Sequence, residues 1–384
     1  MILSHKIQLL PNKGQTIELL KACGCARFAY NWGLAEWTKQ YKEGLKPKAK
    51  DIKKKFNKIK GEEFPWIYES PKDANQQPFS NLDTAFQKFF KKTAKYPTFK
   101  KKGQRDSFYV SNDKVSLSSK HIKLPLIGQI NLSEKLRFDG KIQYVVISRT
   151  ADKWFASIAV DVGSYSKQRM LNEHIGVDLG LKAFATTSAG KVFIAPKPLA
   201  DKLKKLARLQ RRLNRRTKGS KNRFKTKSKI ARIFYTISSI RKDFLNKTTT
   251  SLCRENQSIV IEDLNVHGML KNSRLARSIS DMGWYEFRRQ LAYKSQIFGT
   301  DLIIAPRFYP SSKTCSRCGY IKESLKLSER IFVCESCGAS IDRDYNAAAN
   351  LRTLGPRGIN VCGQGKSVRA LVEAEIGLCS QTST

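Results

Sequence analysis

Four cysteines have the number and spacing that a metal ion would require. They form two Cys-x-x-Cys pairs, Cys315 with Cys318 and Cys334 with Cys337, fifteen residues apart, and a glycine follows each pair. Four thiolates suit the closed tetrahedral coordination of structural zinc, and glycine permits the tight turn of each pair. The presence of two such pairs argues against a redox Cys-x-x-Cys site. We therefore expect one structural Zn²⁺ with no open position for catalysis.

Three acidic residues stand where chemistry could take place. Asp178 ends the apolar stretch IGVD, Glu262 ends the apolar stretch IVIE, and Asp344 precedes the alanine-rich segment YNAAANL. Each has an ordinary alternative role: a turn residue, a surface strand end and a helix N-cap, respectively. Residue type alone does not decide between these separate roles and one site shared by all three acids.

A shared site follows if the two apolar stretches are neighbouring parallel strands of a mixed sheet. Asp178 and Glu262 would then lie at adjacent strand ends, and a helix packed against them would bring Asp344 close. Converging carboxylates repel one another unless cations neutralise them, and their hard oxygen atoms favour Mg²⁺ or Mn²⁺. Two such ions could activate a water molecule and stabilise the leaving oxygen of a phosphodiester.

The chain is strongly basic, with 72 Lys and Arg against 32 Asp and Glu and a formal net charge of +40 over 384 residues. Nucleic acid is the expected partner, although ribosomal proteins and histones are equally basic without being enzymes. No signal-peptide pattern and no apolar run of membrane-spanning length occurs. We expect a cytoplasmic protein with no membrane partner and few disulfides. We expect the other five cysteines to be ordinary free thiols: Cys23, Cys25, Cys253, Cys362 and Cys379.

Two segments concentrate the positive charge. Residues 86–105 contain eight Lys or Arg, five aromatic residues and no acid, and residues 202–229 contain 14 Lys or Arg and no acid. The alternative interpretation is an ordinary solvent-exposed surface, but the positive charge of residues 202–229 exceeds what is usual for a solvent-exposed helix face. Cations with interleaved aromatic rings suit a surface that follows a nucleic-acid backbone. The expected contact residues are Lys100, Lys101, Lys102, Arg208, Arg211, Arg212, Arg215, Arg216 and Lys218.

The hydrophobic pattern predicts a multidomain protein of the α/β and α+β classes. Apolar residues at helical spacing alternate with short runs of period-2 or continuous apolar character. Helices are expected near 17–34, 48–60, 76–94, 203–213, 230–244 and 282–298, and strands at 4–10, within 107–163 and 174–195, and at 258–265 and 301–306. The weakly patterned tail, 355–384, is expected to be poorly ordered.

The order of the motifs resembles the split RuvC-like nuclease of the TnpB family, proteins of insertion sequences related to the type V CRISPR effectors. The stretches GVDLG, IVIEDL and DRDYNAAANL carry the resemblance, with the four-cysteine module before the third. The stretches RFAYNWGL, LDTAFQKFF and KYPTFKKK resemble the N-terminal half of that family. The resemblance therefore covers nearly the whole chain.

The resemblance implies a nuclease core with an RNase H-like (RuvC-type) fold and an inserted zinc ribbon. A small β-barrel with an inserted helical domain would precede it. The implied boundaries are 1–170 for the barrel (wedge) domain with its helical recognition insertion at about 12–95, and 171–354 for the nuclease domain. Within the latter lie a basic helical hairpin, 202–250, and the zinc ribbon, 312–340.

The resemblance further implies an RNA-guided DNA endonuclease, a monomer by preference, that cuts double-stranded target DNA beside a short transposon-adjacent motif. Its guide RNA would derive from the transposon end, and the basic hairpin would lie along the guide–target heteroduplex. The catalytic, Mg²⁺-binding acids map to Asp178, Glu262 and Asp344, with Asp342 as the reserve candidate for the third. Residues matching the motif-reading positions loosely are Gln76, Gln77, Ser107, Phe108 and Tyr109.

Three other functions stay open at this point. A catalytically silent RNA-guided repressor would lack part of the acidic triad, and all three positions here are acids. A DNA-joining transposase shares the RNase H-like core, and the triad alone does not separate water from a 3′-hydroxyl as nucleophile. An inactive zinc-ribbon RNA-binding protein explains the charge and the cysteines but leaves Asp178 and Glu262 unexplained.

Overall fold

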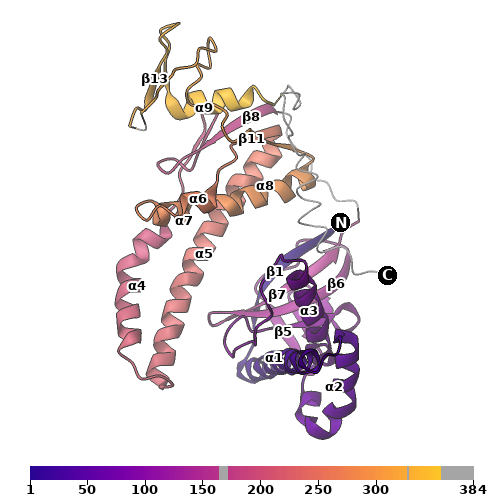
Figure 1. The fold of residues 1–384 in the computed structure, drawn as a ribbon. Coiled ribbons are helices and arrows are strands. Elements are labelled where there is room, and N and C mark those ends of the chain that lie inside the picture. Colours follow the sequence, from indigo (N-terminus) through magenta and orange to yellow (C-terminus); the bar gives the residue numbers. More distant parts are fainter. Residues whose placement is uncertain (164–171, 327, 356–384) are drawn as a thin grey trace. The chain divides into compact units, whose positions relative to one another are not determined.

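The computed structural model describes residues 1–163, 172–326 and 328–355, so the predicted tail lies outside the described residues apart from Gly355. The chain divides into two compact units, Met1–Ser164 and Tyr165–Thr384 (Figure 1). Each unit combines helices with a sheet, which confirms the predicted mixture of α and β structure. No helix in the described ranges is both long enough and apolar enough to cross a membrane.

A seven-stranded antiparallel sheet of order β2-β6-β7-β1-β5-β4-β3 forms the base of the first unit. Its first strand, β1 (Ile2–Leu10), pairs with its last, β7 (Lys153–Asp161). The other strands are β2 (Ser107–Ser111), β3 (Ser116–Ser118), β4 (His121–Leu124), β5 (Gly128–Leu132) and β6 (Lys141–Thr150). Within residues 1–163 the end strands β2 and β3 do not pair with each other, so the predicted closed barrel is not confirmed.

A helical segment lies between β1 and β2 in the chain. It consists of α1 (Lys13–Lys42), α2 (Ala49–Glu63), the 3₁₀ helix η1 (Pro65–Glu69) and α3 (Lys72–Phe90). The helix predicted near 76–94 starts four residues after Lys72, the first residue of α3, and the structure carries Pro78 inside this helix. Gly33 on α1 lets that helix approach the side chains of Phe79 and Leu82 on α3.

The second unit contains a five-stranded mixed sheet of order β10-β9-β8-β11-β12. Its strands are β8 (Asn172–Leu179), β9 (Ala185–Thr187), β10 (Val192–Phe193), β11 (Asn256–Ile261) and β12 (Asp301–Ile304). β8, β11 and β12 run parallel, whereas β9 and β10 continue the sheet antiparallel. The predicted meander within 174–195 and the predicted parallel pairing of the two acid-terminated strands are both confirmed.

Alternating residues of the central strands face two different layers of helices. Ile175, Val177, Ile259 and Ile261 pack in one core with side chains of α5 (Lys221–Glu255) and α8 (Trp284–Phe298). Val260 packs instead with Leu351 of α9 (Arg343–Arg352). The period of two along a strand therefore assigns every second residue of β8 and β11, Gly176 and Val260 among them, to the α9 side.

Helix α9 lies directly on β8 at Gly176. A Cβ atom at Gly176 would lie 2.0 Å from the Ala348 carbonyl oxygen and 2.5 Å from the Arg352 amide nitrogen. Both are backbone atoms, so no side chain could turn aside to make room. The buried alanines Ala347 and Ala348 complete this close contact, since larger side chains would hold the helix away from the strand.

The basic hairpin consists of α4 (Pro198–Asn214) and the long helix α5, which run side by side (Figure 1). Asp281 of α7 (Ala276–Met282) is 3% exposed and holds the base of the hairpin. Its carboxylate accepts hydrogen bonds from the backbone nitrogens of Leu199 and Ala200 and, at 3.0 Å, from Arg241 Nε on α5. One buried carboxylate thus joins the start of α4 to the middle of α5.

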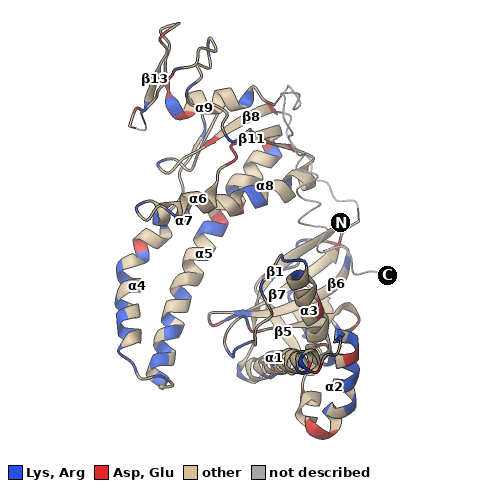
Figure 2. Cartoon of the chain, in the orientation of Figure 1, with Lys and Arg blue, Asp and Glu red and all other residues tan. Residues whose placement is uncertain are grey.

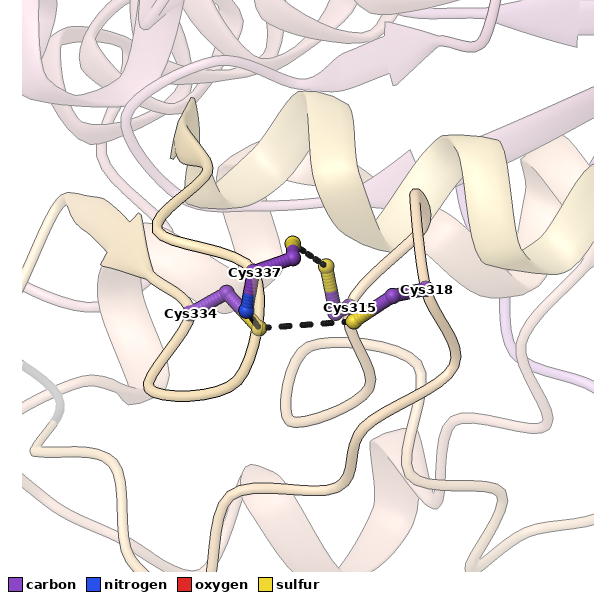
Figure 3. A group of neighbouring side chains, drawn as sticks. All are labelled: Cys315, Cys318, Cys334 and Cys337. Carbon is purple, nitrogen blue, oxygen red and sulfur yellow. Dashed lines mark hydrogen bonds between the residues drawn. The ribbon is translucent and has the colours of Figure 1, made fainter.

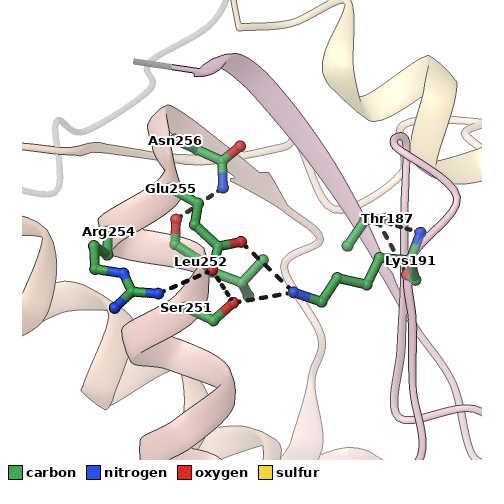
Figure 4. Close-up of polar contacts among 7 residues, drawn as sticks. All are labelled: Thr187, Lys191, Ser251, Leu252, Arg254, Glu255 and Asn256. Atoms are coloured by element: carbon green, nitrogen blue, oxygen red, sulfur yellow. Dashed lines mark hydrogen bonds and ion pairs between the residues drawn. The ribbon is translucent and has the colours of Figure 1, made fainter. Parts of the chain in front are cut away.

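Polar contacts attach the end of α5 to the β9–β10 turn (Figure 4). Lys191 Nζ donates to Ser251 Oγ at 3.2 Å and lies 3.6 Å from a Glu255 carboxylate oxygen. Thr187 holds the backbone of Lys191 on the opposite side of the turn. Because α5 leads straight into β11, these contacts fix where that strand begins.

We predict that Gly176→Ala destabilises the second unit by about 1–3 kcal/mol, because the added methyl group forces α9 away from β8. Denaturant unfolding would measure the loss, and hydrogen exchange would place it at the amides of α9. Gly24→Ala on α1 is the matched control: its Cβ would meet nothing closer than 3.6 Å, so we expect no loss of stability. Equal stability of the Gly176→Ala variant and the parent would contradict the close approach.

Candidate nuclease site

Asp178 and Glu262 lie side by side at the same edge of the sheet. Val177 of β8 pairs with Ile261 of β11 in parallel register, and each acid is the next residue of its chain. Both acids continue the alternation that places Gly176 and Val260 towards α9. The sheet therefore directs these two carboxylates to the layer that carries Asp344.

Asp344 and Asp342 have different roles at the start of α9. Asp342 is the N-cap: its Oδ1 accepts hydrogen bonds from the backbone nitrogens of Asp344 and Tyr345, each at 3.0 Å. Asp344 stands in the first turn, half-buried, with its carboxylate 3.4 Å from the Arg343 guanidinium. The capping role that the sequence allowed for Asp344 thus belongs to Asp342, which leaves the Asp344 carboxylate available.

The acids at the sheet edge repel one another. Burial raises the pKa of Asp178 well above its usual value, and the negative charges of Glu262 and Asp344 raise it further. Burial also raises the pKa of Glu262, although a hydrogen bond from Ser311 Oγ at 2.8 Å opposes the shift. Neither Asp178 nor Glu262 forms an ion pair with Lys or Arg in the described part of the chain.

Asp263, next to Glu262, is neutralised and therefore a poor candidate. Its carboxylate oxygens pair with Arg288 and Arg307, each at 2.7 Å. Partial burial alone would raise the pKa of Asp263, but the hydrogen bonds from these two arginines hold it below its usual value. Of the two adjacent acids that end β11, Glu262 is the one without a protein counter-charge.

The donor set suits a hard divalent cation. Three carboxylates with little protein counter-charge offer the oxygen ligands that Mg²⁺ and Mn²⁺ prefer. In the described ranges, the group of metal-ligating side chains whose ligand atoms already lie within 4.8 Å of one another is the four cysteines and not these acids. Asp178, Glu262 and Asp344 are the residues that would hold such an ion.

The four cysteines converge from two knuckles (Figure 3). The sulfur of Cys315 lies 3.8 Å from that of Cys337, and the sulfur of Cys318 lies 3.5 Å from that of Cys334. Zinc–sulfur bonds of about 2.3 Å in a tetrahedron require sulfurs roughly 3.8 Å apart, so the cluster fits zinc. The glycines after each pair, Gly319 and Gly338, have φ of +80° and +69°, which confirms the predicted left-handed turns.

The zinc module continues directly into the acid-bearing helix. Its hairpin of β13 (Ile331–Val333) and β14 (Ser340–Asp342) ends at Asp342, the cap of α9. Asn346 of α9 accepts from the Ser316 backbone nitrogen at 2.9 Å and donates to the Thr314 carbonyl at 2.7 Å. Asn350, one turn later, donates to the carbonyls of Ser311 and Thr314.

These linking residues were missing from the sequence prediction. Two buried asparagines four residues apart, at 346 and 350, are costly in a helix unless their amides are paired, and that spacing was the available signal. Ser311 carried no signal of its own, because its partner Glu262 lies 49 residues earlier. The sequence analysis included Gly176 only as the first residue of the motif GVDLG and assigned no packing role to it.

The Lys and Arg residues that are predicted to contact nucleic acid lie mostly at the surface. Figure 2 shows Lys and Arg along both helices of the hairpin. Arg208, Arg211, Arg212, Arg215 and Lys218 are exposed, and Arg216 is half-buried. Lys100, Lys101 and Lys102 are exposed as well, and the Lys100 ammonium lies 4.0 Å from the centre of the Tyr30 ring. Burial lowers the pKa of Lys100.

The residues proposed to read the transposon-adjacent motif differ in exposure and in the contacts that they make. Phe108 is 3% exposed on the inward face of β2, in the core of the first unit, so its side chain does not reach the surface. Gln76 exchanges hydrogen bonds with Asn57, Tyr109 stacks on Tyr144 at 5.5 Å, Gln77 is half-buried and Ser107 is exposed.

We predict that the purified chain carries about one zinc ion and that Cys318→Ser removes it, because three thiolates no longer complete the tetrahedron. Elemental analysis would measure the metal content, with Cys253→Ala, a buried thiol outside the cluster, as the control that keeps its zinc. Chelation should abolish hydrogen-exchange protection at 315–342, since binding of structural zinc contributes to folding. Full protection of that segment in metal-free protein would contradict a structural role.

Three family models match the chain in succession. One described as "Helix-turn-helix domain" matches residues 1–46, one described as "Probable transposase" matches 157–273, and one described as "Cas12f1-like, TNB domain" matches 284–351. In the structure residues 1–46 contain β1 and the single long helix α1. The last match spans α8, β12, the zinc module and nearly all of α9.

Two relatives match almost the entire chain. The Escherichia coli (strain K12) protein named "Putative RNA-guided DNA endonuclease InsQ" is 34% identical over 379 residues, which cover 94% of each chain. A Streptomyces pristinaespiralis protein named "Putative RNA-guided DNA endonuclease" is 35% identical and covers 94% of this chain and 91% of its own. A solved Cas12f1–sgRNA–target DNA complex is similar in fold, with a TM-score of 0.53 at 16% identity over 88% of this chain and 83% of that one. The predicted resemblance is confirmed, and the chain belongs to the TnpB family.

Proposed function

We propose that this chain is an RNA-guided DNA endonuclease that hydrolyses phosphodiester bonds of target DNA at the acids Asp178, Glu262 and Asp344. The observation that carries the proposal is the placement of these acids. Asp178 and Glu262 follow adjacent parallel strands, and Asp344 lies in the first turn of the helix packed on those strands. Neither Asp178 nor Glu262 forms an ion pair with Lys or Arg within the described ranges. A nuclease needs such a site, whereas a binding protein would be destabilised by it.

We assign the second unit to the RuvC-type, RNase H-like class. The mixed sheet of order β10-β9-β8-β11-β12, with its three parallel strands, supports this assignment. The first unit corresponds to the wedge and recognition domains in the proposal. The relatives' names and the Cas12f1 complex with guide RNA and target DNA support the same two nucleic acids as partners here.

The residues around the acids prepare the site for hydrolysis. Divalent cations bound there would supply an activated water molecule and Lewis-acid stabilisation of the leaving oxygen. Ser311 holds one oxygen of Glu262, and the Asp342 cap fixes the first turn of α9 and hence the position of Asp344. Hydrolysis adds water across one phosphodiester and leaves a 5′-phosphate and a 3′-hydroxyl.

A second candidate function is DNA joining, favoured by the match of residues 157–273 to a family model described as a transposase. Joining would use a DNA 3′-hydroxyl instead of water at the same acids. End-labelled target DNA separates the two functions. Joined products point to strand transfer, and free 5′-phosphate ends point to hydrolysis.

We predict that RNA recovered with the purified protein guides Mg²⁺-dependent cutting of a matching plasmid beside a randomised flank. Asp178→Ala, Glu262→Gln and Asp344→Asn should each reduce the cleavage rate by more than about 100-fold, because each removes a carboxylate charge that would hold a divalent cation at the site. Binding of guide RNA and target should persist. Guided binding without cutting by the parent chain would support a silent repressor instead.

Asp342→Asn is the matched control for Asp344→Asn. Asparagine caps helices as well as aspartate does, so the Asp342→Asn variant should keep both its α9 cap and its cleavage activity. If Asp342→Asn abolishes cleavage while Asp344→Asn does not, the third acid of the proposal is misassigned.

We predict that replacing Arg208, Arg211, Arg212 and Arg215 together by alanine flattens the salt dependence of target binding. Each lost phosphate contact should reduce the slope of log K against log salt by about 0.7–0.9. The matched control replaces the same four arginines by lysine, which keeps the charge and should keep the slope. Fluorescence anisotropy of labelled target at several salt concentrations gives the slopes, and an unchanged slope in the alanine variant would exclude this hairpin surface.

A further inference from the structure

Phe308 is the most exposed large apolar side chain in the described ranges, at 92%. Single exposed apolar residues are common on protein surfaces, so the exposure alone indicates nothing. Its place in the fold is more informative. Phe308 follows β12, which runs parallel to β11, and therefore emerges at the same edge of the sheet as Asp178 and Glu262.

The register brings the turn that carries Phe308 level with the acids. Ile304 pairs with Ile261, and the Ala305 backbone nitrogen donates to the Ile261 carbonyl at 2.8 Å. The chain then turns at once, because the Tyr309 backbone nitrogen donates to the Pro306 carbonyl at 2.9 Å. Phe308 occupies the third position of this turn, three residues before the serine that holds Glu262.

The residues around Phe308 are fastened to the site. Arg307 pairs with Asp263 at 2.7 Å, and Tyr309 donates its hydroxyl to the Asn350 carbonyl of α9 at 3.3 Å. Ser311 donates to Glu262 at 2.8 Å. The turn is thereby bound to β11 and to α9, the two elements that carry Glu262 and Asp344, while the ring of Phe308 extends into solvent.

A rigidly held, solvent-facing ring beside a phosphodiester-cleaving site suits a nucleobase. The phenyl ring has no hydrogen-bonding group, so it can offer only a stacking surface, which tolerates every base. The bases of an intact duplex already stack on their neighbours, so the ring can reach only a base that is unpaired. We propose that Phe308 stacks on an unpaired base of the strand being cut and so holds the nearby phosphodiester at the three acids. This inference rests on the proposed nuclease function.

The first test measures contact directly. The cleavage-inactive variant Asp178→Ala, loaded with guide RNA and with no chelator present, is titrated with single-stranded DNA that contains 2-aminopurine, whose fluorescence falls on stacking. Adding Phe308→Ala should abolish the quenching and weaken binding by about 5- to 150-fold, the range for loss of one base–aromatic stack. Phe308→Trp should restore both, whereas Phe308→Leu, apolar but without a flat π face, should not. Equal quenching by the alanine and parent proteins would overturn the proposal.

The second test uses guided cleavage by the otherwise unaltered chain. Phe308→Ala should cut a matched target about 5- to 150-fold more slowly while keeping its guide binding and melting temperature, since the side chain packs against little. An abasic scan of the cut strand should reveal one position whose missing base slows the parent but not Phe308→Ala. A parent-like rate in Phe308→Ala would overturn this inference alone; a parent chain that does not cut at all would overturn the nuclease function with it.

Discussion

The close approach of α9 to β8 at Gly176 is the contact on which the candidate site depends. A side chain at Gly176 would meet backbone atoms of the helix at 2.0 and 2.5 Å, so only glycine allows the two elements to touch. Asp178 lies two residues further along the same face of the strand, and Asp344 lies one helical turn before Ala348. The distance between these acids is therefore set by backbone contact and not by flexible side chains. Such positioning is what catalysis by several groups together requires.

The zinc module acts on the site through covalent continuity and through two asparagines. Its second strand ends at the cap of α9, so the orientation of the helix start depends on the folded hairpin. Asn346 and Asn350 fasten the first knuckle to the helix, and Ser311 of the same segment reaches Glu262. Zinc therefore need not touch substrate to matter. Besides the cysteines, the buried cluster in the described part of this module consists of Phe332 and Ala339, so a metal that ties four thiolates together would hold the segment in place.

The sequence predicted features that depend on neighbouring residues better than features that depend on contacts between distant segments. Cysteine spacing and the apolar strands before Asp178 and Glu262 are local patterns, and they indicated the cysteine cluster and the parallel pairing correctly. The predicted start of α3 lies four residues after the observed one, since the end of a helix carries a weaker local signal than its interior. Phe108 was proposed only from a loose resemblance to the family, and its side chain is buried on the inward face of β2. The predicted closure of the first sheet into a barrel depended on pairing between distant strands, which no local pattern encodes. The bond between Ser311 and Glu262 was hidden for the same reason.

The second unit concentrates charge of opposite sign in two places, positive on the basic hairpin and negative at the edge of the sheet. The hairpin carries exposed cations whose repulsion is relieved by solvent and, in the proposed function, by phosphates. At the sheet edge the reverse holds: burial and the neighbouring charges of Glu262 and Asp344 raise the pKa of Asp178, so the isolated chain is destabilised there until cations arrive. Asp263, one residue from Glu262, has its charge neutralised by Arg288 and Arg307, so proximity to the site does not by itself leave an acid unpaired. Stabilising contacts at Gly176, Asn346 and Asn350 offset the repulsion without neutralising it. The destabilisation is thus confined to the acids whose negative charge a divalent cation would neutralise.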